Sequence, residues 1–168
     1  MPSKKITYLK YKKFGNRVEW DGIKIVVSKI SSHNKQYGVI ATKNLLKGTR
    51  IPYFGKMRKE SSLTGKENYC YFMHLRKNII LDGNPKYEPL KGKWITSRIN
   101  EPPKGCRLNC RQVRPLKKLT SHGHQRIFYE TLTDIKPGKE LFVSYEYTEE
   151  ERQLPHLNYD VSSKCINK

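Results

Sequence analysis

The sequence predicts a mainly β (α+β) domain, and three observations support this prediction. Short runs of β-branched and aromatic residues recur along the chain, turns rich in Gly and Pro separate them, and no long stretch repeats with helical periodicity. At 168 residues, the chain has room for one domain, with or without a short appendage. The hydrophobic fraction is only 36%, but 11% aromatic residues add bulk for a core.

The elements expected in the first half of the chain are short. Residues 1–13 mix basic and apolar residues, which fits either an edge strand or a basic arm. The polar stretch 58–68 predicts a short helix or a loop. Pro52 favours an edge or irregular position, because proline cannot donate a hydrogen bond to a neighbouring strand. Strands are expected at 23–27, 38–42 and 50–55.

The second half predicts a hairpin, an irregular stretch and two further strands. The hairpin pairs 69–73 with 78–83, and the irregular stretch at 84–98 contains two prolines and a glycine. The strands are expected at 126–132 and 141–145. Because side chains alternate along a strand, the last one would place the rings of Tyr145 and Tyr147 on the same face.

The charge is strongly basic and unevenly distributed. The chain has 34 Lys and Arg against 15 Asp and Glu, a net charge of +19. Such a field favours contact with a polyanion, most plausibly nucleic acid or a nucleoprotein. Acidic residues gather near the C-terminus instead, where a patch beside the two tyrosines could attract a cation: Glu146, Glu149, Glu150, Glu151 and Asp160.

Compartment signals are few. No 18-residue apolar run is present, so a transmembrane helix is not expected, and no apolar segment typical of a secretory signal follows the basic N-terminus. Four scattered cysteines are too few for a disulfide framework, which favours a reducing intracellular setting. Cys106, Cys110 and Cys165 do not supply the four ligands of a structural zinc site, and no metal is expected.

Four segments carry the functional signal, and their order along the chain matters more than any one of them. They are Tyr37-Gly38-Val39-Ile40-Ala41-Thr42, then Tyr53-Phe54-Gly55, then Arg98-Ile99-Asn100-Glu101 with Cys106-Arg107-Leu108-Asn109-Cys110, and finally Asp134 through Tyr145. Together they resemble a SET domain, the fold of protein lysine methyltransferases that use S-adenosylmethionine. The resemblance spans about residues 23–147.

The resemblance implies several small antiparallel sheets, few short helices and a knot-like threading of the C-terminal strand. It also divides the chain into three parts. Residues 1–22 would form a basic N-terminal arm or edge strand, 23–147 the SET domain with a variable insert at about 56–96, and 148–168 a C-terminal tail. The compact core, without the cysteine-rich segment that follows many SET domains, resembles small viral or microbial members.

The resemblance also implies a set of site residues. The cofactor-binding residues would be Tyr37, Gly38, Val39, Tyr53, Asn100, Glu101, Asn109 and Tyr145. Tyr145 matches the catalytic tyrosine, with Tyr53 and Tyr147 as further catalytic or channel residues. Tyr147, Glu146 and Glu149 would bind the substrate. Three residues depart from the family pattern: Gln36 replaces a glycine, Glu101 a histidine and Leu108 a proline.

The implied function is transfer of a methyl group from S-adenosylmethionine to a lysine of a basic protein, most plausibly a histone tail. Nucleosomal or other nucleic-acid contact, a location in the nucleus or on chromatin (the host nucleus or the virion for a viral protein) and no membrane partner fit this function. Either residues 148–168 or the second subunit of a homodimer would complete the channel wall. The alternative is a catalytically impaired SET-like module that binds chromatin or nucleic acid, which the three departures motivate.

Overall fold

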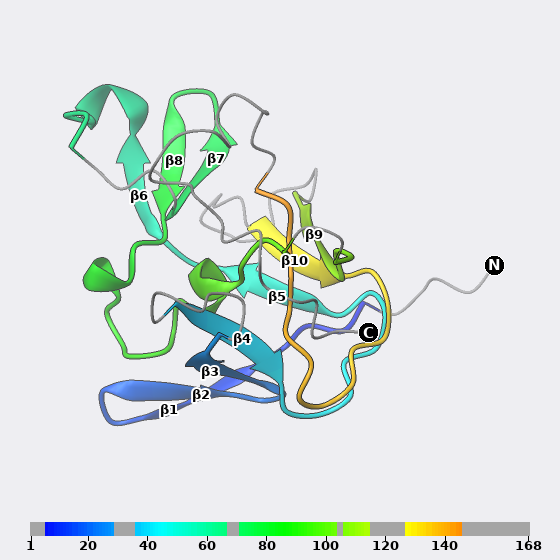
Figure 1. The fold of residues 1–168 in the computed structure, drawn as a ribbon. Helices are drawn as coiled ribbons and strands as arrows, with labels where there is room; N and C mark the ends of the chain where they lie inside the picture. Colours follow the sequence, from blue (N-terminus) through cyan, green and yellow to red (C-terminus); the bar gives the residue numbers. More distant parts are fainter. Residues whose placement is uncertain (1–5, 29–35, 67–70, 104–105, 115–126, 146–168) are drawn as a thin grey trace.

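The computed structural model describes residues 6–28, 36–66, 71–103, 106–114 and 127–145 (Figure 1). Within these residues the chain forms four small antiparallel sheets and short 3₁₀ helices, which confirms the mainly β prediction. The 3₁₀ helices are η1 (Glu60–Ser62), η3 (Pro85–Tyr87) and η4 (Ile95–Arg98). None of the described helices is long and apolar enough to cross a membrane.

Two of the sheets are two-stranded. β1 (Tyr11–Phe14) pairs with β2 (Arg17–Trp20), and β3 (Ile23–Val27) pairs with β4 (Tyr37–Ala41). The first pair corrects the sequence prediction, which expected an arm or an edge strand before residue 22 and missed this hairpin. This hairpin has a small hydrophobic face, on which the ring centroids of Tyr11 and Trp20 lie 5.0 Å apart. Such aromatic cross-strand pairs stabilise short hairpins.

The other two sheets have three strands each. One has the order β5 (Arg50–Tyr53), β10 (Ile127–Thr131), β9 (Cys110–Val113), and the other the order β6 (Lys56–Lys59), β8 (Ile79–Asp82), β7 (Phe72–Arg76). The predicted hairpin is therefore present as β7–β8. Pro52 lies in an outer strand of its sheet, as expected. In the central strand β10, three consecutive side chains are buried, so both faces of that strand are covered.

The segment after β10 is where the sequence prediction of secondary structure was wrong. A strand was expected at 141–145, but only isolated bridges form there, between Ile40 and Glu140 and between Asn100 and Phe142. The backbone N–H of Leu141 donates to Val39 at 2.8 Å, whereas that of Val143 donates to Asn100 at 3.0 Å. Since successive N–H groups bind different parts of the fold, no continuous ladder forms. In Figure 1 this segment, drawn in orange, runs past β4 and β5 toward β9 and β10.

The core lies between the sheets and holds this segment in place. Leu141, Val143 and Val39 have no exposed surface, and Ile99 and Ile127 are almost as deeply buried. Burial of such side chains stabilises each by roughly 1.5–3 kcal/mol. Residues far apart in sequence are thereby fixed side by side.

Candidate functional site

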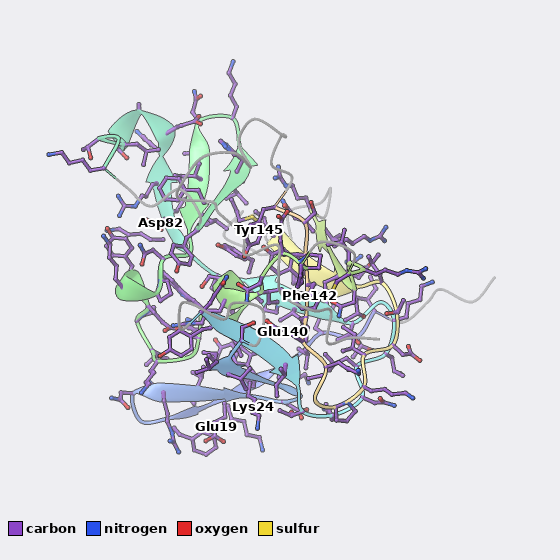
Figure 2. All side chains as sticks on the ribbon, in the orientation of Figure 1. Glu19, Lys24, Asp82, Glu140, Phe142 and Tyr145 are labelled. Atoms are coloured by element: carbon purple, nitrogen blue, oxygen red, sulfur yellow. The ribbon has the colours of Figure 1, made fainter. Side chains whose placement is uncertain are left out.

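Tyr145 is held at both its backbone and its hydroxyl. Its hydroxyl donates to the carbonyl oxygen of Ile99 at 2.7 Å, and its backbone N–H donates to Oε1 of Glu101 at 2.6 Å. Ile99 follows η4 directly and Glu101 comes two residues later, so the segment after this short helix fixes the ring. A hydrogen bond to a carboxylate is shorter and stronger than one between neutral groups. Figure 2 shows Tyr145 near the middle of the molecule.

A small pocket of about 70 Å³ brings Tyr145 of the fourth motif segment together with Tyr53 of the second. The hydroxyl of Tyr53 donates to the carbonyl oxygen of Tyr71 at 2.8 Å, and its ring meets that of Tyr129 edge-on with centroids 5.7 Å apart. The pocket is mixed in character, with aromatic walls and several hydroxyl groups. Its lining residues are Tyr53, Phe72, Met73, Thr96, Ser97, Ile99, Gln112, Tyr129, Ser144 and Tyr145.

The sequence did not single out most of these lining residues. Phe72 and Met73 come from β7 and Tyr129 from β10, two elements that carry none of the four motifs. The one available signal for Tyr129 was its place in a predicted strand, which by itself indicates packing. Only the assembled sheets show that this ring faces the pocket.

Asn109 clamps the C-terminal segment from one side. Its Nδ2 donates to the carbonyl oxygen of Glu140 at 2.7 Å, and its Oδ1 accepts from the N–H of Phe142 at 2.7 Å. The side-chain amide of Asn109 therefore makes the pair of hydrogen bonds that the backbone of a neighbouring strand would otherwise make. This role is structural, and it explains how the chain is held just before the site without a regular ladder.

Asn100 clamps the same segment from the other side. Its Nδ2 donates to the carbonyl oxygen of Tyr37 at 3.0 Å and to Oε1 of Glu140 at 3.2 Å, while its Oδ1 accepts from Nε2 of Gln36 at 2.9 Å. A primary amide has two N–H donors, so both are engaged here. Its oxygen still has one lone pair that could face a ligand. Gln36, the departure from the family glycine, thus orients this amide.

The carboxyl group of Glu140 lies against Gly38 and beside Asn100. It is buried, and its carboxylate accepts from Oγ of Ser28 at 2.9 and 3.1 Å in addition to Asn100. A side chain added at Gly38 would collide with that carboxylate. Any larger residue at this position would therefore force the carboxylate of Glu140, which Ser28 and Asn100 hold in place, to shift. Figure 2 shows Glu140 beside β4.

Burial raises the pKa of the Glu140 carboxyl above its ordinary value of 4.5, while the hydrogen bonds from Ser28 and Asn100 act in the opposite direction. Burial disfavours the charged form because the interior solvates it poorly. Donors aimed at the carboxylate compensate in part. Glu140 was not among the residues predicted from the sequence, although it lies in the fourth motif.

The remaining predicted residues divide into three groups. Tyr37 is exposed at the start of β4, whereas Val39 in the same strand is fully buried. Tyr147, Glu146 and Glu149 lie outside the described residues.

The cysteines differ from one another. Burial raises the pKa of the Cys110 thiol to about 12, so the thiolate is scarce at neutral pH. Cys106 is disulfide-bonded, and its partner lies outside the described residues. This bond departs from the expectation of reduced cysteines. Within the described residues, no group of three or more His, Cys, Asp and Glu side chains is arranged to hold a metal ion.

Comparison with known proteins supports the reading of the motifs. The family model of the SET domain matches residues 36–146. A comparison with curated protein sequences found no match. The match to the family model covers all four motif segments, from the exposed Tyr37 to the pocket residue Tyr145.

Two solved structures have a similar fold. One is the methyltransferase domain of human PR domain-containing protein 2, with a TM-score of 0.55 and 24% identity over 76% of this chain and 79% of that one. The other is KRYPTONITE in complex with mCHH DNA, H3(1-15) peptide and SAH, with a TM-score of 0.56 and 16% identity over 82% of this chain and 26% of that one. At these identities the likeness concerns the fold.

Proposed function

Because this chain belongs to the SET-domain family, we propose that it transfers a methyl group from S-adenosylmethionine to the side-chain amine of a lysine in a protein. One observation carries the proposal: the small pocket in which Tyr145 and Tyr53 lie together with Phe72 and Tyr129. A pocket of this small volume suits the end of an extended alkyl chain with an amine at its tip, and its aromatic walls suit a cation.

The aromatic pocket would prepare the amine for attack. A free lysine has a pKa of about 10.4, so the amine is almost fully protonated at neutral pH. Removal from water disfavours the charged form and lowers that pKa. The pocket would also align the neutral amine with the methyl group. Such positioning of reacting groups can lower the activation barrier of a reaction by up to about 7–11 kcal/mol.

Tyr145 would orient the amine rather than deprotonate it. Its hydroxyl hydrogen is directed at the carbonyl oxygen of Ile99, so the phenol oxygen can present a lone pair to an incoming N–H. An ordinary phenol with a pKa of about 10 is a weak base at neutral pH. The contacts with Ile99 and Glu101 keep the ring in place while the substrate binds.

S-adenosylmethionine would supply an electrophilic methyl group on a sulfonium. One feature near Gly38 fits this cofactor. Asn100 retains one lone pair on Oδ1 for an ammonium group, while the space beside Gly38 itself is filled by the carboxylate of Glu140. Tyr37, Val39, Tyr53, Glu101, Asn109 and Tyr145 remain the further candidates for this site.

The substrate that we propose is a basic protein, with a histone tail as the first candidate. The high density of acidic residues after Tyr145 supports this choice, because Glu146 and Glu149 would attract lysine and arginine side chains. Tyr147 would form part of the channel. Binding at this end of the domain would bring a basic tail to the pocket despite the positive net charge.

The wider setting that we propose follows from charge and from the family. A net charge of +19 supports contact with nucleosomal or other nucleic acid and a place on chromatin or in the nucleus. The catalytic domain would comprise residues 23–147 with an insert at about 56–96, preceded by a basic N-terminal part and followed by a tail at 148–168. That tail or a second subunit would cover the channel.

The test is methyl transfer measured by mass spectrometry. The full chain is incubated with S-adenosylmethionine and either histone octamers, nucleosomes or a basic non-histone protein, and each lysine is then scored. Mass added to histone lysines supports the proposal, and mass added only to the non-histone protein replaces the histone as substrate. Calorimetry with the cofactor separates the alternative: a folded chain that does not bind S-adenosylmethionine would be the impaired module.

A further inference from the structure

A cluster of cations surrounds the ring of Tyr87 and shares no residue with the pocket. The Nζ atoms of Lys86 and Lys56 lie 4.7 and 5.2 Å from the centroid of this ring, and Cζ of Arg58 lies 4.8 Å from it. Lys56 and Arg58 belong to β6, whereas Lys86 and Tyr87 belong to η3. Two separate elements therefore bring three positive charges to one aromatic ring.

The fold neutralises this cluster only in part. Nε of Arg58 lies 3.0 Å from Oδ2 of the buried Asp82. Lys56 and Lys86 make no ion pair with any residue of the described ranges. The neighbouring Glu88 is engaged with Arg98 at 3.3 Å. The positive charges of Lys56, Arg58 and Lys86 all lie near the same ring, and like charges repel each other. An anion bound among them would therefore stabilise the cluster.

The cations also act on the hydroxyl of this ring. The proximity of Lys86 and, to a smaller extent, of Arg58 lowers the pKa of the Tyr87 hydroxyl. The basic surface also extends past the ring. Nζ of Lys93 lies 5.3 Å from the ring centroid of Phe54, two residues before Lys56. Lys59 is exposed on the same outer strand, but alternation places it on the face opposite Lys56 and Arg58. In Figure 1, β6 and the green coil of η3 occupy the same side of the molecule.

We propose that these residues, Lys56, Arg58, Lys86 and Tyr87 (the Tyr87 patch), bind the phosphodiester backbone of a nucleic acid. Lysines act as point charges toward phosphates, and an arginine presents a planar fork to them. A tyrosine among these cations can contact a sugar or phosphate or stack on a base. The arginine is already paired with Asp82, and lysines that contact phosphates carry no sequence information, so binding is expected to be independent of sequence.

Protection of a sheet edge is the competing explanation for some of these charges. Lysines on outer strands prevent two sheets from pairing edge to edge, and β6 is an outer strand of its sheet. This explanation accounts for Lys56 and Lys59. It does not account for Lys86, which comes from η3, or for the gathering of three cations on one ring.

The inference rests on the nucleic-acid contact in the proposed function and assigns it a surface. The experiment measures binding of a fluorescent DNA duplex of random sequence to the full chain by anisotropy, over a series of salt concentrations. It compares the wild type with Lys56→Gln/Lys86→Gln. The matched control is Lys47→Gln/Lys136→Gln, which removes two exposed charges from loops joined by the Leu45–Ile135 bridge, away from β6.

We expect the patch variant to bind several-fold more weakly and to lower the slope of log affinity against log salt by about 2, one for each lost phosphate contact. The control should change the slope much less. Equal losses in the two variants would show that only net charge matters and would overturn the site. Stronger competition by polyglutamate than by unlabelled duplex would assign the patch to an acidic protein instead.

Methyl transfer to a free peptide separates this inference from the proposed function. The patch variant should methylate the peptide at the wild-type rate, since none of its substituted residues lines the pocket. A wild type that methylates but binds no duplex would overturn the patch and leave the methyltransferase proposal intact. A wild type that binds duplex through the patch but transfers no methyl group would overturn the methyltransferase proposal and leave the patch intact. Thermal unfolding checks that both variants are folded.

Discussion

The carboxylate of Glu101 accepts a hydrogen bond from the backbone N–H of Tyr145 at 2.6 Å, across a sequence separation of 44 residues. Glu101 stands where the family resemblance has a histidine, and its side chain is buried. The substitution therefore has a structural consequence in this chain, because an acidic side chain braces the residue that we propose as the catalytic tyrosine.

This contact leads to a first prediction. Glu101→Ala should leave the Tyr145 N–H unsatisfied, which costs about 1–3 kcal/mol, and should lower kcat more than it raises KM. Glu101→Gln keeps an acceptor oxygen and should recover most of the activity. The measurements are steady-state methyl transfer and urea unfolding. An Ala variant with wild-type kcat would contradict a positioning role.

The hydroxyl of Tyr145 gives a second prediction. Tyr145→Phe removes the bond to Ile99 and the group that orients the amine, and methyl transfer should fall by roughly 10²-fold, as for loss of one oriented polar group in other active sites. Binding of the cofactor should change little. Tyr11→Phe is the control, since that ring packs on Trp20 and Phe54 outside the pocket. Full activity of Tyr145→Phe would rule out the role proposed for its hydroxyl.

The buried Glu140 gives a third prediction, on pH. Its raised pKa means that the folded protein keeps this proton to a higher pH than the unfolded chain. Stability from this group is therefore greatest below the ordinary carboxyl pKa and falls as pH rises through the raised one. Glu140→Gln cannot ionise and should lack that fall.

Urea unfolding at pH values from about 4 to about 7 checks the prediction. The free energy of unfolding of Glu140→Gln, minus that of the wild type, should increase with pH. The control is Glu19→Gln, an exposed glutamate on β2. A constant difference between the Glu140 variant and the wild type over this range would mean that the carboxyl does not titrate differently in the fold.

The close approach of Gly38 to Glu140 gives a fourth prediction. Gly38→Ala would place a methyl group against the carboxylate and should destabilise the fold by about 1–3 kcal/mol, as overpacking does elsewhere. Shortening the partner in Gly38→Ala/Glu140→Asp should recover part of this loss. A double-mutant cycle measures the coupling. Strict additivity of the two changes would show that the two residues do not constrain each other.

The order of the motifs predicted the family correctly, whereas local residue patterns were less successful at predicting individual strands. The apolar run Leu141-Phe142-Val143 has the composition of a strand, yet its N–H groups bind Val39, Asn100 and Asn109 separately. Local propensity cannot reveal this, because the partners come from three distant segments. The β1–β2 hairpin was missed for another reason: its strands are only four residues long and mostly exposed.

The sequence by itself determined the β class and the family, and it singled out two of the tyrosines that line the pocket, Tyr53 and Tyr145, because these depend on residue types in a given order. The tertiary structure decided which groups support them. Glu101 beneath Tyr145, Glu140 behind Gly38 and Tyr129 in the pocket wall follow from contacts between segments far apart in the chain. Burial and hydrogen bonding act through space, and only the folded chain brings those atoms together.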